Sequence, residues 1–172
     1  VKGFKNNIII IGGGPYITCD LKNAIKDSNI DYFVIGEGEI TFSEMIEKLL
    51  DNQDLRGIKG VAYRENSRAN YQPRPFIKNL NKLPFPDYSI ISSKTYAKFI
   101  NYAYNRRKYA GIFSSRGCPY GCIYCHSIFG KKFRARSPEN VLQEMTSLYK
   151  KFNIKDFFIF DDNFNFDYDR AT

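Results

Sequence analysis

The sequence has little of what marks membrane proteins and secreted proteins. No apolar run approaches the roughly 20 residues that a helix needs to cross a bilayer, and the N-terminus lacks a signal-peptide pattern. The only histidine is His126, and the 4 cysteines comprise one isolated thiol and a cluster, which is not the pattern of a disulfide framework. We therefore expect a cytoplasmic protein in a reducing environment, with no membrane partner.

What is present is an ordinary globular composition with an uneven charge. Hydrophobic residues make up 43% and charged residues 26% of the chain, as in soluble globular proteins. A length of 172 residues allows one domain or two small ones. The whole net charge of +8 falls in the segment from Arg106 to Arg136, which carries bases and no acid. Three interpretations stay open: a solvated basic face, a nucleic-acid surface, or electrostatic support for an anionic site. The metal motif described next lies in this segment and favours the third over the second.

Three of the cysteines form a compact motif, Cys118-x3-Cys122-x2-Cys125. Glycine and proline around them predict a tight loop that turns the three sulfurs toward one point. Three thiolates are soft ligands, suited to zinc, copper(I) or an iron–sulfur cluster. A closed structural zinc site uses four ligands, and His126, directly after Cys125, is poorly placed to be the fourth. The motif predicts a metal centre with an open position; a zinc knuckle or disulfide loop is the alternative.

The first third of the chain alternates apolar strands with glycine turns. Residues 8–11 and 32–35 read as strands buried on both faces of a parallel sheet, and each runs into glycines. The carboxyl edge of such a sheet is where ligands bind. A weak helical pattern covers residues 20–27, and a second helix is predicted from Thr41, with Glu44 completing a capping box. Its expected buried stripe is Phe42, Met45, Ile46, Leu49 and Leu50.

The rest of the chain predicts a hairpin, a linker and a second βαβ unit. Residues 60–64 and 71–77 read as hairpin strands, prolines then mark a linker, and a short helix is expected within residues 90–104. Residues 109–113 and 157–160 read as strands. Between them, Ser137 is the expected N-cap of a helix with Pro138 in its first turn. The expected buried stripe of this helix is Val141, Leu142, Met145, Leu148 and Tyr149.

The cysteine motif, with Tyr124 before its last cysteine, resembles the signature loop of the radical S-adenosylmethionine superfamily. The resemblance implies that Cys118, Cys122 and Cys125 bind three irons of a 4Fe–4S cluster, while S-adenosylmethionine takes the fourth iron. One electron, from a donor such as flavodoxin or ferredoxin, then yields a 5′-deoxyadenosyl radical. The resemblance implies that this radical serves the methylation, cyclisation or rearrangement of a substrate that is a small molecule or of unknown class.

The resemblance also assigns contacts to S-adenosylmethionine. It places Tyr124 beside the adenine and puts the polar cluster Asp161, Asp162 and Asn163, at the end of the second barrel strand, near the amino group and ribose. A carboxylate facing an ammonium group is sound chemistry for that role.

A second resemblance covers the first half of the chain. Residues 10–15, 31–39 and 58–64, together with the bridge segment (residues 80–88), are similar to the last part of the cobalamin-binding domain of one radical S-adenosylmethionine subfamily. This implies that the two glycine turns lie near the nucleotide tail of cobalamin; the turn residues are Gly12, Gly13, Gly14, Gly36, Glu37 and Gly38. The Asp-x-His-x-x-Gly motif of some members is absent. Either the sequence begins within such a domain, or cobalamin binding has been lost.

Together these patterns predict an α/β fold: the C-terminal part of a Rossmann-like parallel sheet, followed by the first βα units of a partial (β/α) radical barrel. The expected domain bounds are 1–78, a proline-containing linker at 79–105, and 106–172. We expect a fragment of a radical S-adenosylmethionine enzyme that is inactive alone. The alternative is a non-catalytic zinc or iron–sulfur module with a basic nucleic-acid-binding face.

Overall fold

The computed structural model describes residues 8–66, 68–90, 109–126 and 128–172. The chain divides into two compact units. Unit 1 comprises residues 1–77 and 121–130, and unit 2 comprises residues 78–120 and 131–172. The domain bounds expected above stay a prediction, and the short helix expected within residues 90–104 falls almost entirely outside the described residues.

Unit 1 is built on a four-stranded sheet in the order β1-β2-β3-β4. The strands are β1 (Ile11–Gly12), β2 (Tyr32–Val34), β3 (Val61–Glu65) and β4 (Arg68–Tyr71). The first two are parallel and the last two form an antiparallel hairpin, as the sequence predicts, although the second hairpin strand lies at 68–71 and not at 71–77. The expectation that residues 8–11 are buried on both faces is wrong: Ile8 and Ile9 are 38% and 47% exposed. Ile8 and Ile9 precede β1, which begins only at Ile11 and, among the described residues, stands at one end of the strand order.

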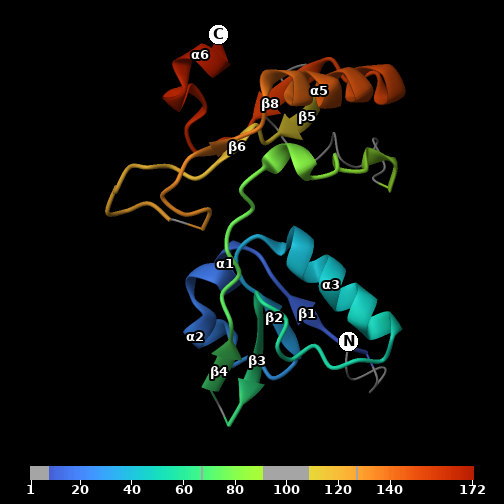
Figure 1. Cartoon of the computed structure of the whole chain (residues 1–172), viewed down its shortest axis with the longest axis vertical. Coiled ribbons are helices and arrows are strands. Elements are labelled where there is room, and N and C mark those ends of the chain that lie inside the picture. Colours follow the sequence, from blue (N-terminus) through green and yellow to red (C-terminus); the bar gives the residue numbers. More distant parts are fainter. Residues whose placement is uncertain (1–7, 67, 91–108, 127) are drawn as a thin grey trace. The chain divides into compact units, whose positions relative to one another are not determined.

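Helices pack on both faces of this sheet because consecutive strand residues point to opposite sides. Phe33 packs in a cluster with residues of α1 (Pro15–Cys19) and the α2 region (α2, Leu21–Ala24). Its neighbour Val34 packs in a second cluster with Met45 of α3 (Gly38–Leu50). Figure 1 shows α1 and α2 on one side of the strands and α3 on the other. Unit 1 thus has the three-layer arrangement of a Rossmann-like domain.

The start and buried face of α3 differ from the expectation. The helix begins at Gly38 after Glu37, and no side chain caps it, so the capping box is wrong. Thr41 lies inside the first turn, is fully buried and donates its hydroxyl to the carbonyl of Lys59 at 3.3 Å. Thr41 and Met45, one turn apart, define the buried face. Phe42, Ile46 and Leu50 are exposed, so their assignment to the buried stripe of this helix is wrong.

Unit 2 contains the expected βαβ arrangement. Strands β5 (Tyr109–Ile112) and β8 (Asp156–Ile159) are parallel neighbours, and α5 (Pro138–Phe152) connects them (Figure 1). The Ser137 side chain accepts a hydrogen bond from the backbone N–H of Asn140 at 3.3 Å, which confirms it as the N-cap. The remaining elements are the short strands β6 (Ser115–Arg116) and β7 (Arg134–Ala135), 3₁₀ helices at Leu80–Lys82, Tyr88–Ile90 and Phe164–Phe166, and α6 (Tyr168–Ala171).

The buried face of α5 contains a charge that the apolar pattern does not show. Val141 and Leu148 pack with β5 in one core cluster, as expected. Leu142 and Tyr149 are 60% and 52% exposed, so their assignment to the core is wrong. Glu144 is buried on this face of α5 instead. Its carboxylate oxygen Oε2 lies 2.5 Å from Nη1 of Arg136.

None of the helices in the described parts of the chain has the length and apolarity of a bilayer-spanning segment.

Candidate functional site

The cysteine loop leaves unit 2 through β6 and returns through β7. These two short strands pair antiparallel, Ser115 with Ala135 and Arg116 with Arg134, and so form the stems of the loop. The loop therefore begins just after the carboxyl end of β5, the edge of a parallel sheet where chemistry is usually found.

The three cysteines are free thiols in different surroundings. Cys118 is half-buried, whereas Cys122 and Cys125 are exposed. A turn joins the last two, because the backbone N–H of Cys125 donates to the carbonyl of Cys122 at 3.2 Å. Among the described residues, no three His, Cys, Asp or Glu side chains are grouped so that they could hold a metal ion. The convergence of the three sulfurs thus stays a prediction, although the donor set of three accessible soft ligands fits an iron–sulfur cluster.

Tyr124 and its neighbour Ile123 project from the loop. They are 89% and 102% exposed, so the ring of Tyr124 is open to a ligand. Its assignment to the adenine of S-adenosylmethionine stays a prediction.

The polar cluster after β8 separates into one buried and two accessible residues. Asp162 is exposed and Asn163 is half-buried. The carboxylate of Asp161 is fully buried and accepts hydrogen bonds from Ser114 and Ser115, through both their backbone N–H groups and their hydroxyls. The structure thus brings Asp161 to the base of the cysteine loop. Sequence reasoning gave no role to the two serines, although they directly precede the motif.

Part of the basic segment is used inside unit 2. Arg134 is buried, and Arg136 donates to Glu144, to Asn140 and to the carbonyl of Phe113. These guanidinium groups stabilise the fold around the loop stems. The segment is therefore not a uniform solvated face; its residues 106–108 lie outside the described residues.

The two glycine turns of unit 1 follow the parallel strands β1 and β2. Gly14 and Gly36 have positive φ angles of 98° and 76°, and a Cβ atom on either would meet nothing within 4 Å. Both turns thus need glycine for their backbone and leave open space above it. Glu37 is different, because it is buried and its carboxylate accepts from the backbone N–H of Ile77 at 2.6 Å.

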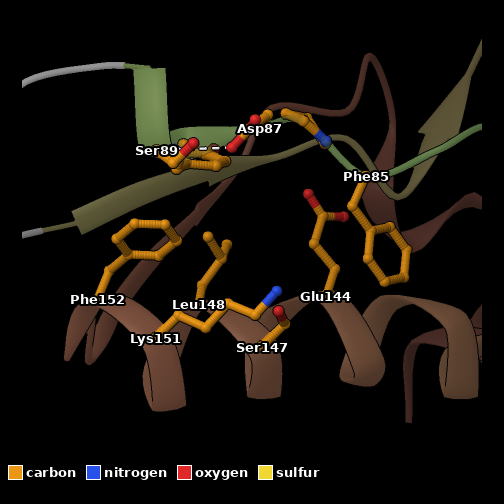
Figure 2. A pocket seen from close by; sticks show the side chains of 10 residues that line it. Phe85, Asp87, Ser89, Glu144, Ser147, Leu148, Lys151 and Phe152 are labelled. Atoms are coloured by element: carbon orange, nitrogen blue, oxygen red, sulfur yellow. Dashed lines mark hydrogen bonds between the residues drawn. The ribbon is translucent and has the colours of Figure 1, made fainter.

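Unit 2 also holds a cavity of about 390 Å³ between the bridge segment and α5. Figure 2 shows Ser147, Leu148 and Lys151 of α5 lining one side of the cavity and Asp87 and Ser89 lining the other. The Ser89 hydroxyl and backbone N–H, and then the charge of Lys151, hold the pKa of Asp87 below its ordinary value. Sequence analysis assigned no role to Asp87 or Ser89. The Asp-x-Ser spacing is a turn pattern that could have shown the turn, whereas the effect of the Lys151 charge depends on the fold.

Several known proteins are similar to this chain in sequence and in fold. No family model matches the sequence. The chain is 33% identical to the uncharacterized methyltransferase PH0819 of Pyrococcus horikoshii, over 99% of this chain and 37% of that protein. It is 29% identical to the cobalamin-dependent radical SAM methyltransferase TokK of Streptomyces tokunonensis, over 95% of this chain and 24% of TokK. The chain thus resembles the radical S-adenosylmethionine superfamily over almost its whole length, as the cysteine motif predicts. TokK is cobalamin-dependent, which agrees with the predicted resemblance to the subfamily that carries an N-terminal cobalamin-binding domain.

Solved structures of radical S-adenosylmethionine proteins show the same fold. The methyltransferase TsrM of Kitasatospora setae, with tryptophan and a SAM analogue bound, matches with a TM-score of 0.72 at 22% identity, over 95% of this chain and 31% of TsrM. A second TsrM structure, with cobalamin and a [4Fe-4S] cluster bound, matches with a TM-score of 0.69 at 21% identity, over 96% of this chain and 32% of TsrM. The chain spans about a third of the length of these proteins, and its α/β fold is that of their matching part.

Proposed function

We propose that this chain is the part of a radical S-adenosylmethionine enzyme in which Cys118, Cys122 and Cys125 hold a 4Fe–4S cluster. One observation carries the proposal: three free thiols lie within eight residues, on a loop whose stems continue from the carboxyl end of a parallel strand. When bound, the cluster supplies the electron that splits S-adenosylmethionine, and the protein positions and tunes these cofactors.

The residues around the loop have separate tasks in this proposal. Tyr124, which is exposed, would contact the adenine. Asp162 and Asn163 would orient the amino group and ribose, because a carboxylate and an amide oxygen both accept hydrogen bonds from such donors. Asp161 was assigned with them by resemblance, but its four acceptor sites already serve the two serines.

Cobalamin is part of the proposal for unit 1. TsrM holds cobalamin together with a [4Fe-4S] cluster. In this chain the two parallel strands run into glycine turns that leave open space at Gly14 and Gly36. Backbone N–H groups at such turns can approach a nucleotide or phosphate closely, which suits the nucleotide tail of that cofactor.

The reaction and its partners follow from the superfamily. A small molecule is the proposed substrate, and a flavodoxin or ferredoxin is the proposed reductant. Methyl transfer and cyclisation are both proposed reaction classes, because the relatives include methyltransferases and an anaerobic magnesium-protoporphyrin IX monomethyl ester cyclase. The alternative function, a metal module that binds nucleic acid, is weakened because Arg134 and Arg136 are used within unit 2.

Competitive metal loading tests the proposal. We expect the chain, offered iron, sulfide and zinc together under anaerobic conditions, to turn brown and to contain four irons and four sulfides, because three thiolates leave one position that a structural zinc site would need filled. Elemental analysis and sulfide assay measure this, with thiol-alkylated protein as the control for adventitious iron. One zinc per colourless chain would overturn the enzyme proposal in favour of the metal module.

A further inference from the structure

The carboxylate of Asp161 is saturated by its neighbours. Its Oδ1 accepts from the backbone N–H groups of Ser114 and Ser115 at 2.7 and 3.0 Å. Its Oδ2 accepts from their hydroxyls at 2.5 and 2.7 Å. A carboxylate offers about four lone-pair sites, so the two serines use its full capacity. Ser115 begins β6, and the acid therefore fixes the point at which the cysteine loop leaves the sheet.

Arg170 of α6 extends this network. Its Nη1 donates to the hydroxyl oxygen of Ser114 at 3.0 Å, and its Nη2 lies 3.7 Å from Oδ2 of Asp161. The side chains of Arg170 and Asp161 are 9% and 0% exposed. Hydrogen bonds to charged groups in such a dry environment are stronger than those between neutral groups at the surface.

Aromatic contacts from the same segment reach the loop on both of its sides, beyond the stems. The ring of Phe166 lies 6.2 Å from that of Tyr120, on the outgoing side, and 4.9 Å from that of Phe133, on the returning side. The guanidinium of Arg170 lies 5.7 Å from the centre of the Phe133 ring. Residues 161–170, which we call the clamp segment, thus contact the cysteine loop on both of its sides.

We propose that Asp161 is a positioning residue: acting through Ser114 and Ser115, it fixes the base of the cysteine loop, and the clamp segment holds the loop stems in place. The link to a cluster rests on the function proposed above, whereas the positioning of the loop does not. In this account Asp161 holds the cysteine loop in place and does not contact S-adenosylmethionine. The residues proposed to contact S-adenosylmethionine are Asp162, Asn163 and Tyr124.

Limited proteolysis of the metal-free chain tests the clamp by itself. Asp161→Asn keeps the shape of the side chain but replaces one accepting oxygen with a donating NH₂ group, which then faces serine donors. Because each hydrogen bond to a charged group accounts for more than a factor of ten in a local equilibrium, we expect trypsin to cut after Lys131 or Lys132 at least about tenfold faster. Ser115→Ala, which removes one hydroxyl donor, should give a smaller acceleration.

The matched control is Asp169→Asn, the same substitution at an exposed position of the clamp segment, and it should be cut at the rate of the unchanged chain. Equal cutting rates for Asp161→Asn, Ser115→Ala and the unchanged chain would overturn the clamp.

Iron release connects the clamp to the cluster. After anaerobic reconstitution, Asp161→Asn should lose iron to a chelator at least about tenfold faster than the unchanged chain, since residues that orient metal ligands contribute factors of about 10–100 to affinity. Leu148→Ala, which removes a buried side chain from the α5 core, is the control for lower overall stability and should release iron at the unchanged rate.

Iron release that instead followed the melting temperature across these variants would overturn the positioning role. Faster nicking of Asp161→Asn in a chain that takes up no iron would support the clamp and overturn the proposed function, so the two failures are distinguishable.

Discussion

Alanine at any one of Cys118, Cys122 and Cys125 is expected to lower the iron content of the reconstituted chain by more than about tenfold. Replacing residues that merely orient metal ligands already lowers affinity by about 10–100-fold, and removing a ligand should exceed this. Two remaining thiolates cannot hold three irons of a cluster. Iron and sulfide analysis after anaerobic reconstitution, together with visible absorption, measures the effect.

The isolated cysteine supplies the control for this series. Cys19 ends α1 in unit 1 and is exposed, so Cys19→Ala removes an accessible thiol without touching the motif. It should bind as much iron as the unchanged chain. Iron content that fell equally in all four variants would contradict the assignment, because it would indicate iron bound to any accessible thiol.

Glu144→Gln is expected to lower the free energy of unfolding by about 3–5 kcal/mol, since it leaves one member of a buried ion pair without its counter-charge. The side chains of Glu144 and Arg136 are only 3% and 11% exposed, and their charged atoms lie 2.5 Å apart. Urea denaturation followed by far-ultraviolet circular dichroism measures the loss, because α5 is the longest described helix.

A double-mutant cycle separates the ion pair from the rest of the site. In the Arg136→Met background, Glu144→Gln should lower the free energy of unfolding much less, because no buried guanidinium is then left without a counter-charge. Glu139→Gln on the exposed first turn of α5 is the matched single control and should have a much smaller effect. A loss at Glu144 of less than about 1 kcal/mol, typical of solvent-exposed pairs, would contradict this account.

The parts of the fold that follow from local patterns were predictable. Ser137 and Pro138 begin α5 as their types dictate, and the apolar runs before and after it form the parallel pair β5 and β8. The first glycine turns follow parallel strands for the same reason. These features depend on residues that are close in sequence, where propensity and periodicity carry the information.

The rest depended on contacts between distant residues. Thr41 and Glu44 match a capping box, yet Thr41 donates to Lys59 and Glu44 pairs with Arg74. Ile8 and Ile9 are apolar enough for a core, but the sheet gives β1 a neighbour on one side within the described residues. Periodicity cannot tell which charge on a helix meets a buried partner, so Glu144 was missed.

The candidate site shows the same division. The spacing of the cysteines identifies the motif by itself, because it lies within eight residues. The role of Asp161 could not be read in this way, since its partners Ser114 and Ser115 lie more than forty residues away. The serines look like ordinary loop residues until the fold brings the end of β8 beside the end of β5.

Electron paramagnetic resonance of the reconstituted, reduced chain, recorded with and without S-adenosylmethionine, tests the central claim most directly. The account predicts a 4Fe–4S signal that changes when S-adenosylmethionine is added, because three cysteines leave one iron open to it. A chain that takes up stoichiometric zinc and gives no cluster signal would contradict the account.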